Sequence, residues 1–497
     1  MKTTVSSLVI KALQINQSKS IIGKKVNDRW IWKDKKYLLN SVNYCQDYLK
    51  AEKVSKGDRV AYKGENSIEW LAWNIACNSL GGIWVPMYTG QSDEYCNHVL
   101  KDSGASILVA DSSCDFKCST TKTIDSNIYR YERGKELEYV YNDISSLIYT
   151  SGTTGKPKGV MLSNENIISN IYSTRSLFSN MPETTSLNIL PWAHIYSQTC
   201  ELYYNILFNN KMALCTSRDT FVKELREINP DVLYVVPRIL ELIKAKTDFL
   251  EGPFINCLTP LILKRVLGKN LKTIFVGGAK LQTSTKEFFI KNGYNICEGY
   301  GCTELSPMVS VNHMEYPRDE ESVGRIIDDV IVEIINDEIQ VSGPNVMKGY
   351  WNDPSATKNV LVERDNKIWY KTGDGGYVKD GFLFYSGRNS YNYKLSNGKF
   401  VNVEYVESVV KDYIKCNCVV FTQDNIHNEL IVNRELSEEF LEVINKSLKN
   451  NYLKIHKAHW LKDKDWQSYL TPKMSVKRKN LINDFMDNKL DCIEINY

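Results

Sequence analysis

The segment Thr150-Ser-Gly-Thr-Thr-Gly-Lys-Pro-Lys-Gly159 is the densest group of residues able to do chemistry. Its three glycines allow backbone amides to approach an anion, while its hydroxyls and two lysines supply donors and positive charge. These properties predict a phosphate site. It is not a Walker A loop, because two residues rather than four separate Gly152 from Gly155 and Pro157 stands where Ser or Thr would hold magnesium. From composition alone, a solvated surface loop is the alternative.

Such a loop needs a strand before it and a helix after it, and the flanking sequence predicts both. Leu147 to Tyr149 is a buried strand candidate, and Ser163 is a predicted N-cap for the helix that follows. From about residue 61 to residue 297, short apolar runs alternate with amphipathic ones, which is typical of helices on a largely parallel sheet.

Three further apolar runs predict buried strands of the same fold: Ile107 to Ala110, Leu233 to Val236, and Thr273 to Val276. Pro237 suits the first turn of a helix. The apolar residues that we expect on the inward side of that helix are Ile239, Leu240, Leu242 and Ile243.

The pattern of apolar and turn residues changes beyond Glu321. Short strand candidates separated by turn residues predict a β-rich subdomain over about residues 321–387. After Arg388, a polar stretch leads into about a hundred residues of mixed helix and strand. We therefore expect an α/β protein with a large N-terminal domain of α/β layers over residues 1–387, followed by a small, mobile α+β C-terminal domain over residues 388–497.

The loop at residues 150–159 resembles the signature loop of the adenylate-forming superfamily, which includes acyl-CoA synthetases, luciferases and peptide synthetase adenylation domains. Four further segments match that superfamily in order: Leu190-Pro-Trp-Ala-His-Ile-Tyr196, Gly277-Gly-Ala279, Gly299-Tyr-Gly-Cys-Thr-Glu304, and Tyr370-Lys-Thr-Gly-Asp374 leading to Gly387-Arg388. The stretches Thr303 to Ser310 and Lys394 to Val401 are most similar to the fatty acyl-CoA synthetase branch.

The resemblance implies an ATP-dependent acid–thiol ligase. A carboxylate is a poor electrophile, so it first displaces pyrophosphate from ATP, and the acyl-adenylate then passes its acyl group to a thiol. Positioning, cations and Mg²⁺ promote the in-line attack. We expect a medium- or long-chain fatty acid and CoA as substrates, with ATP and Mg²⁺ as cofactors.

The resemblance also assigns residues to this site. The phosphates would lie against Thr150, Ser151, Gly152, Thr153, Thr154, Gly155 and Lys158, with Thr303 at the α-phosphate. Mg²⁺ would be held by Glu304 and Thr154, since a hard cation prefers oxygen ligands. The remaining nucleotide contacts would come from Gly278, Ala279, Tyr300, Gly301, Asp374 and Arg388.

Three residues complete the assignment. His194 would position the carboxylate, although a histidine near a proline is also a common packing or capping residue, and the nearby Trp192 could equally belong to the core. Lys477, counted from Leu470-Thr-Pro472, would reach the carboxylate and α-phosphate; the alternative is a solvated basic tail. Gly398 would lie against the pantetheine arm of CoA after the small domain rotates.

The sequence departs from the superfamily pattern at the domain hinge and near the catalytic lysine. Ser390 and Tyr391 stand where a charged hinge residue and an acid are usual, and Ser475-Val476 lacks the usual glycine or paired lysine before Lys477. A serine can still absorb the backbone rotation of the hinge. These departures leave the rate of domain rotation and the register of Lys477 open.

The composition limits the classes of partner and the compartment that this protein could have. The net charge of +3 over 497 residues excludes nucleic-acid binding by bulk charge. Thirteen scattered cysteines indicate reduced thiols in the cytoplasm. No run is long enough for a signal peptide or a transmembrane segment, while peripheral contact with a membrane surface stays open. The sequence does not indicate an oligomeric state.

Two alternatives remain at this stage. One is an adenylating enzyme with another carboxylate or acceptor, such as an aryl acid, an amino acid or an acyl carrier protein; Glu201 is the acid that could bind an amino group. The other is a non-catalytic nucleotide- or acyl-binding homologue, suggested by Ser390, Tyr391 and the irregular Lys477 segment.

Overall fold

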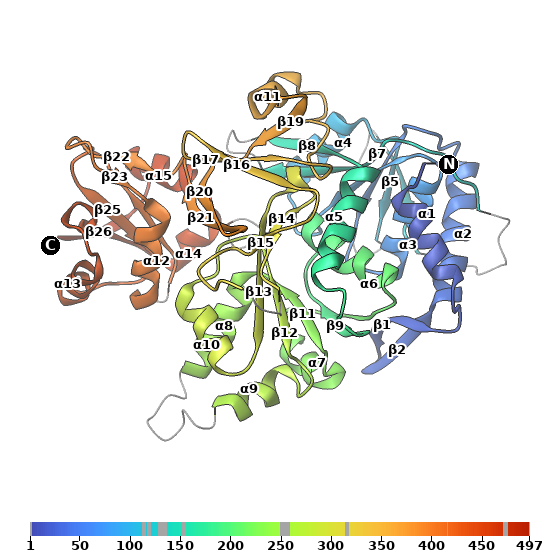
Figure 1. Ribbon diagram of the computed structural model, residues 1–497, viewed down its shortest axis with the longest axis horizontal. Coiled ribbons are helices and arrows are strands. Elements are labelled where there is room, and N and C mark those ends of the chain that lie inside the picture. Colours follow the sequence, from blue (N-terminus) through green and yellow to red (C-terminus); the bar gives the residue numbers. More distant parts are fainter. Residues whose placement is uncertain are drawn as a thin grey trace.

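The computed structural model describes residues 2–111, 116, 121–127, 137–151, 156–248, 259–313, 318–414, 416–470 and 476–496. Two large sheets, a four-stranded sheet and two small C-terminal sheets organise these residues (Figure 1). The predicted α/β class is confirmed. Among the described residues, no helix is long and apolar enough to cross a membrane.

The first large sheet has the strand order β6-β5-β3-β4-β7-β8. Its strands are β3 (Arg59–Lys63), β4 (Ile83–Met87), β5 (Ile107–Ala110), β6 (Lys122–Asp125), β7 (Ile144–Ser151) and β8 (Pro157–Ser163). All pairs are parallel except the hairpin of β7 and β8. That hairpin carries the predicted phosphate loop between its strands.

Helices cover both faces of this sheet. They are α1 (Val5–Gln14), α2 (Lys35–Ala51), α3 (Ile68–Ser79) and α4 (Asp93–Ser103). Side chains alternate along β3: Val60 and Tyr62 pack in the core that contains α1 to α3, while Ala61 packs with Val99 and Leu100 of α4.

The second large sheet has the order β2-β1-β10-β9-β11-β12-β13-β14-β15-β21-β20. Its N-terminal and central strands are β1 (Ser20–Val26), β2 (Arg29–Asp34), β9 (Thr185–Asn188), β10 (Lys211–Leu214), β11 (Val232–Val235), β12 (Thr273–Val276) and β13 (Asn295–Gly301). Its remaining strands are β14 (Met308–Val311), β15 (Arg325–Ile326), β20 (Asp374–Lys379) and β21 (Phe382–Arg388). In this order, the neighbouring strands from β1 to β13 are parallel to one another. The neighbouring strands from β13 to β20 are antiparallel.

The two faces of this sheet have different partners. Leu233 and Val235 of β11 pack against α7 (Phe221–Ile228), α8 (Pro237–Asp248), α9 (Thr259–Leu267) and α10 (Thr283–Lys291). Tyr234 of β11 and Phe275 of β12 point to the opposite face, where they meet Phe178 at the end of α5 (Asn164–Leu177). The π-helix η1 (Ser197–Tyr203) and α6 (Tyr204–Leu207) lie beside α5.

A third sheet, β16-β17-β19-β18, follows the second in the chain. It consists of β16 (Ile331–Ile335), β17 (Glu338–Ser342), β18 (Leu361–Arg364) and β19 (Lys367–Lys371), with α11 (Pro354–Val360) beside it. Strands β20 and β21 return to the second large sheet, so residues 321–387 contribute to two sheets.

The C-terminal residues have a core of their own. The strands are β22 (Tyr393–Lys394), β23 (Phe400–Val401), β24 (Cys418–Phe421), β25 (Asn428–Val432), β26 (Ile455–Leu461) and β27 (Cys492–Asn496). The helices are α12 (Val403–Ile414), α13 (Glu438–Ser447), α14 (Asp463–Trp466) and α15 (Arg478–Met486), with short 3-10 turns η3 (Asn451–Leu453) and η4 (Gln467–Tyr469). In Figure 1 this unit lies at the opposite end of the molecule from α1 and α2.

Sequence reasoning located several of these elements closely. The predicted strands at 107–110 and 273–276 are β5 and β12, and Ser163 caps α5 by accepting from the amide of Asn166. The inward set predicted for α8 is wrong at Leu242, whose side chain is 46% exposed while Leu240 is fully buried. Residue 242 lies outside the helical stripe formed by residues 239, 240 and 243.

Candidate active site

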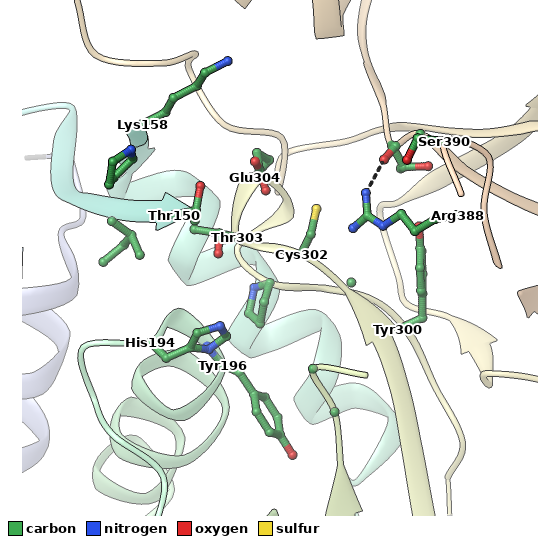
Figure 2. A pocket seen from close by; sticks show the side chains of 18 of the residues that line it. Thr150, Lys158, His194, Tyr196, Tyr300, Cys302, Thr303, Glu304, Arg388 and Ser390 are labelled. Atoms are coloured by element: carbon green, nitrogen blue, oxygen red, sulfur yellow. Dashed lines mark hydrogen bonds between the residues drawn. The ribbon is translucent and has the colours of Figure 1, made fainter. Parts of the chain in front are cut away.

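One cavity of about 1650 Å³ joins the two large sheets to the C-terminal unit. It is lined by ten of the residues assigned by resemblance: Thr150, Lys158, His194, Gly278, Tyr300, Gly301, Thr303, Glu304, Arg388 and Lys477. These residues span more than three hundred positions of the chain. Figure 2 shows how strands β7 and β13, the turn after β13 and the end of β21 bring most of them to one pocket.

The hairpin of β7 and β8 presents the predicted phosphate-binding residues. Thr150 pairs with Lys158 in the register of the two strands. The Lys158 ammonium lies 5.3 Å from the ring centroid of Tyr350, a cation–π contact. Nε2 of His98 lies 2.9 Å from the carbonyl oxygen of Pro157, next to Lys158. The hairpin therefore holds a cation at the cavity wall.

The assigned residues Gly152, Thr153, Thr154 and Gly155 lie outside the described residues, as does the side chain of Ser151. The magnesium role of Thr154 and the phosphate roles of its neighbours stay predictions.

Glu304 lies on η2 (Thr303–Leu305), one turn of 3-10 helix that follows β13. The turn is held close to the strand because Gly301 has no side chain: a Cβ there would lie 1.8 Å from the carbonyl oxygen of Pro307. The Tyr350 hydroxyl donates to Oε1 of Glu304 at 2.9 Å. The buried Thr303 adds a hydroxyl to the same cavity wall.

The Asp374 carboxylate lies behind the cavity wall and is held by two lining residues. The Tyr300 hydroxyl donates to its Oδ2 at 2.6 Å, and Nε of Arg388 forms an ion pair with its Oδ1 at 2.8 Å. Burial raises the pKa of Asp374 to about 6, while Arg388 and Tyr300 oppose that rise. Asp374 is 4% exposed and is not among the residues that line the cavity, so its contact with a ribose stays a prediction.

Two assigned residues in this part of the chain differ in placement. Gly278 lines the cavity with φ of +86°, a backbone conformation suited to glycine. Ala279 is exposed and is not among the residues that line the cavity.

His194 lies at the border between the polar and the apolar parts of the cavity (Figure 2). Its Nδ1 accepts from the amide of Tyr196 at 3.1 Å, which fixes the ring orientation. Trp192 is fully buried and packs edge-on against Trp70 with ring centroids 5.5 Å apart. The core alternative is therefore the one observed for Trp192.

Beyond His194 the cavity becomes aromatic and apolar. Tyr234 stacks on Phe275 with centroids 4.9 Å apart, and Phe178 meets Phe275 edge-on at 5.1 Å. Tyr196 and Tyr204 also line this part of the cavity. Such a surface suits the apolar part of an organic acid.

Glu201 does not face the cavity. It is fully buried on the π-helix η1, where Oε2 accepts hydrogen bonds from Asn188 at 2.6 Å and Ser197 at 3.0 Å. Burial raises the pKa of Glu201 to about 8, so the group is mostly protonated and neutral at pH 7. This placement disfavours a role in binding the amino group of an amino-acid substrate.

The C-terminal unit contributes Lys477 to the cavity. The Lys477 ammonium donates to the carbonyl oxygen of Ser468 at 3.2 Å, so its charge is held within its own unit in this structure. The neighbouring Arg478 instead pairs with the buried Glu407 and lies 4.8 Å from the ring centroid of Tyr391. Arg478 thus has a structural role that Lys477 lacks.

The hinge residues line the cavity, whereas Gly398 does not. Ser390 and Tyr391 line the cavity at the junction of the two units. Gly398 is exposed, has φ of +80°, and is not among the cavity-lining residues. Only a rearrangement of the C-terminal unit would bring Gly398 to this cavity.

The residues present fit a magnesium ion that is shared with phosphate groups. No group of three or more His, Cys, Asp or Glu side chains able to hold a metal occurs among the described residues. Mg²⁺ commonly binds through one or two carboxylates and substrate phosphates rather than in an all-protein cage. Glu304 is the carboxylate placed for that arrangement.

Sequence reasoning missed Tyr350. This tyrosine contacts both Lys158 and Glu304, and the amide of the next residue, Trp351, donates to the carbonyl oxygen of Gly159. The loop that contains Tyr350 therefore links the β7–β8 hairpin to η2. The Gly349-Tyr350-Trp351 sequence, a glycine before two aromatic residues in a polar stretch, is the signal that could have drawn attention to it.

Comparison with known proteins decides the family. The family model described as AMP-binding enzyme matches residues 26–351. The chain belongs to the AMP-binding enzyme family. This membership, together with relatives that are CoA ligases, confirms the resemblance to adenylate-forming enzymes and the expected class of AMP-forming acid–CoA ligase.

Relatives of this AMP-binding enzyme use different acids. A long-chain-fatty-acid–CoA ligase of Rattus norvegicus is 27% identical over 500 residues, covering 82% of this chain and 67% of the relative. A feruloyl-CoA synthase of Amycolatopsis sp is 26% identical over 388 residues, covering 73% of this chain and 75% of the relative. O-succinylbenzoate CoA synthetase of Bacillus subtilis, solved with ATP and magnesium, has the same fold, with a TM-score of 0.79 at 23% identity over 96% of this chain and 99% of that chain.

Proposed function

We propose that this enzyme activates a medium- or long-chain fatty acid with ATP, releasing pyrophosphate, and transfers the acyl group from the adenylate to CoA. The observation that carries the proposal is the continuity of one cavity from the cationic and carboxylate groups of Lys158 and Glu304 to the aromatic end beyond His194. A nucleotide and an apolar acid could therefore meet at His194.

In this proposal the polar wall holds ATP. The β7–β8 hairpin binds the terminal phosphates, with Lys158 supplying positive charge, and Thr303 donates to the α-phosphate. Asp374 accepts from the ribose hydroxyls and is kept in place by Tyr300 and Arg388. Glu304, oriented by Tyr350, would hold Mg²⁺, which neutralises phosphate charge during attack by the carboxylate.

The apolar wall selects the acid. Burial of each methylene of an acyl chain contributes about 0.8 kcal/mol, so an aromatic pocket favours apolar acids over polar ones. The position of His194 suits a residue that orients the carboxylate toward the α-phosphate. The burial of Glu201 makes an amino-acid substrate the weaker alternative.

We further propose that residues 1–387 and 388–497 act as two domains that change their relative position between the half-reactions. Lys477 would turn from Ser468 toward the carboxylate and α-phosphate during adenylation. Rotation about Ser390 and Tyr391 would then replace Lys477 with Gly398, where a glycine leaves room for the pantetheine arm.

Exchange of labelled pyrophosphate into ATP tests the proposal, first with fatty, aryl and amino acids and then with CoA added. We expect exchange that depends on fatty acid and Mg²⁺, followed by acyl-CoA formation. Exchange with aryl or amino acids alone would overturn the proposed acid, and exchange without a CoA thioester would overturn the acceptor. Absence of exchange with every acid would favour a non-catalytic homologue.

A further inference from the structure

Three polar side chains of α4 form a stripe that faces the β7–β8 hairpin. They belong to Tyr95, His98 and Asp102, which are spaced three and four residues apart and so lie on one face of the helix. Tyr95 and His98 also line the main cavity. This face of α4 therefore lies beside the strands that carry Thr150 and Lys158.

Two of these side chains hold backbone carbonyl groups of the hairpin, one on each strand. The Tyr95 hydroxyl donates to the carbonyl oxygen of Tyr149 at 3.2 Å. Nε2 of His98 lies 2.9 Å from the carbonyl oxygen of Pro157, and because a carbonyl oxygen only accepts, Nε2 is the donor. Both carbonyl groups directly precede the paired residues that line the cavity. The two contacts therefore act at the base of the predicted phosphate loop.

Asp102 holds β7 and the loop that contains Tyr350. Its Oδ2 accepts from the Tyr149 hydroxyl at 2.6 Å, and its carbonyl oxygen accepts from Nε1 of Trp351 at 3.1 Å. The Tyr149 ring is 4% exposed and lies over Gly159, where a Cβ would come within 2.9 Å of the ring. Strand β7 is thus fixed by its own side chain as well as by its backbone.

Strand β8 starts without a donor to the ladder. Its first residue, Pro157, has no amide proton and cannot donate a hydrogen bond to β7. Since the strand starts without that bond, the hydrogen bond from His98 contributes to the position of Pro157 and of Lys158 directly after it.

From these contacts we propose that His98 is a positioning residue, whose hydrogen bond to Pro157 sets the place where the Lys158 ammonium meets the terminal phosphates of ATP. A displacement of about 1 Å can cost about a hundredfold in rate, so a shift at the start of β8 would slow adenylation even though His98 acts only through Pro157. The inference rests on the proposed function, in which the hairpin binds the β- and γ-phosphates.

A positioning role through the hairpin predicts an effect that depends on which phosphates a ligand has. ATP and pyrophosphate have the phosphates that the hairpin would bind, whereas AMP has only the α-phosphate assigned to Thr303. His98→Met removes the donor and should weaken ATP and pyrophosphate binding roughly five- to tenfold, with AMP binding changed less than about twofold. His98→Gln has nearly the same shape as His98→Met but retains an amide donor, so it should restore most of the affinity.

Calorimetric titration of the full-length chain with ATP and Mg²⁺, with pyrophosphate and Mg²⁺, and with AMP measures these affinities. The wild type is compared with His98→Met, His98→Gln and His98→Phe, the last being a second variant without a donor. His427→Met changes a partly exposed histidine of the C-terminal unit and should leave all three affinities unchanged. Melting temperatures show whether each variant is folded, and the KM for pyrophosphate in the exchange reaction should rise with the dissociation constant.

Equal loss of ATP and AMP affinity in the variants without a donor would indicate a structural role and overturn the inference, as would unfolding of both. Wild-type affinity for ATP in either of them, or a His98→Gln protein that binds ATP no better than His98→Met, would also overturn it. A wild type that binds AMP but neither ATP nor pyrophosphate would instead contradict the proposed role of the hairpin, so the two failures are distinguishable.

Discussion

At the scale of the residue, the three carboxylates considered for the site differ in their surroundings. Glu304 lies at the cavity and accepts from Tyr350, whereas Asp374 is almost buried and is paired with Arg388. Glu201 is buried with neutral donors only. Position and partners therefore give these three carboxylates different surroundings, which is consistent with the different roles proposed for them.

Asp374 gives nucleotide binding a predicted dependence on pH. Its pKa of about 6 means that it becomes protonated, and loses acceptor capacity, as the pH falls through that value. ATP affinity should therefore weaken below about pH 6, and Asp374→Asn should bind roughly tenfold more weakly at pH 7.5, with a flatter profile. Calorimetric titration checks this against Asp380→Asn, an exposed turn residue. Parallel profiles for wild type and Asp374→Asn would contradict the assignment.

Glu201 gives stability a predicted dependence on pH. Its pKa in the folded chain, about 8, lies above the ordinary value of 4.5, so the folded state binds more protons than the unfolded state between these values. The wild type should therefore lose stability relative to Glu201→Gln as the pH rises from about 5 to 8, by at most about 1.4 kcal/mol per pH unit. Scanning calorimetry of both proteins measures the difference. A melting-temperature difference that does not change with pH would refute it.

At the scale of the element, the approach of β13 to the turn after it decides where Glu304 lies. Any side chain at residue 301 would collide with the Pro307 backbone. Gly301→Ala should therefore displace η2 and abolish Mg²⁺-dependent exchange, with a loss of stability of about 3 kcal/mol or more. Gly90→Ala is the matched control, because its Cβ would meet nothing within 4 Å. Full activity in Gly301→Ala would show that η2 tolerates the shift.

The elements themselves were largely accessible from the sequence, whereas the contacts between them were not. Short apolar runs such as 107–110 and 273–276 are strands because both faces of these parallel strands are buried. The pairs Tyr300–Asp374 and Tyr350–Glu304 join residues far apart in the chain, so they depend on strand order rather than on local pattern. The burial of the Glu201 side chain could not be predicted, because the residues next to it in the sequence do not determine how deeply it is buried.

At the scale of the whole molecule, the small C-terminal unit should serve the two half-reactions with different residues. Lys477→Ala should reduce adenylation about a hundredfold or more but leave thioester formation from supplied acyl-adenylate nearly intact. Gly398→Asn, chosen because asparagine tolerates positive φ, should do the reverse. Separate assays of each half-reaction measure both effects.

The Lys479→Ala variant tests which lysine of the segment acts in adenylation, because it removes the same charge from the same segment as Lys477→Ala. Its effect on adenylation should be small. A larger loss in Lys479→Ala than in Lys477→Ala would move the catalytic role by two residues, and equal loss of both half-reactions in Lys477→Ala would point to a structural role instead.

The most direct measurement is mass spectrometry of a single-turnover mixture of enzyme, Mg²⁺, ATP and a fatty acid, without CoA. We predict acyl-adenylate and pyrophosphate in equal amounts, with neither formed by Glu304→Gln. Formation of ADP with an acyl phosphate, or recovery of unchanged ATP despite binding of both substrates, would contradict the account.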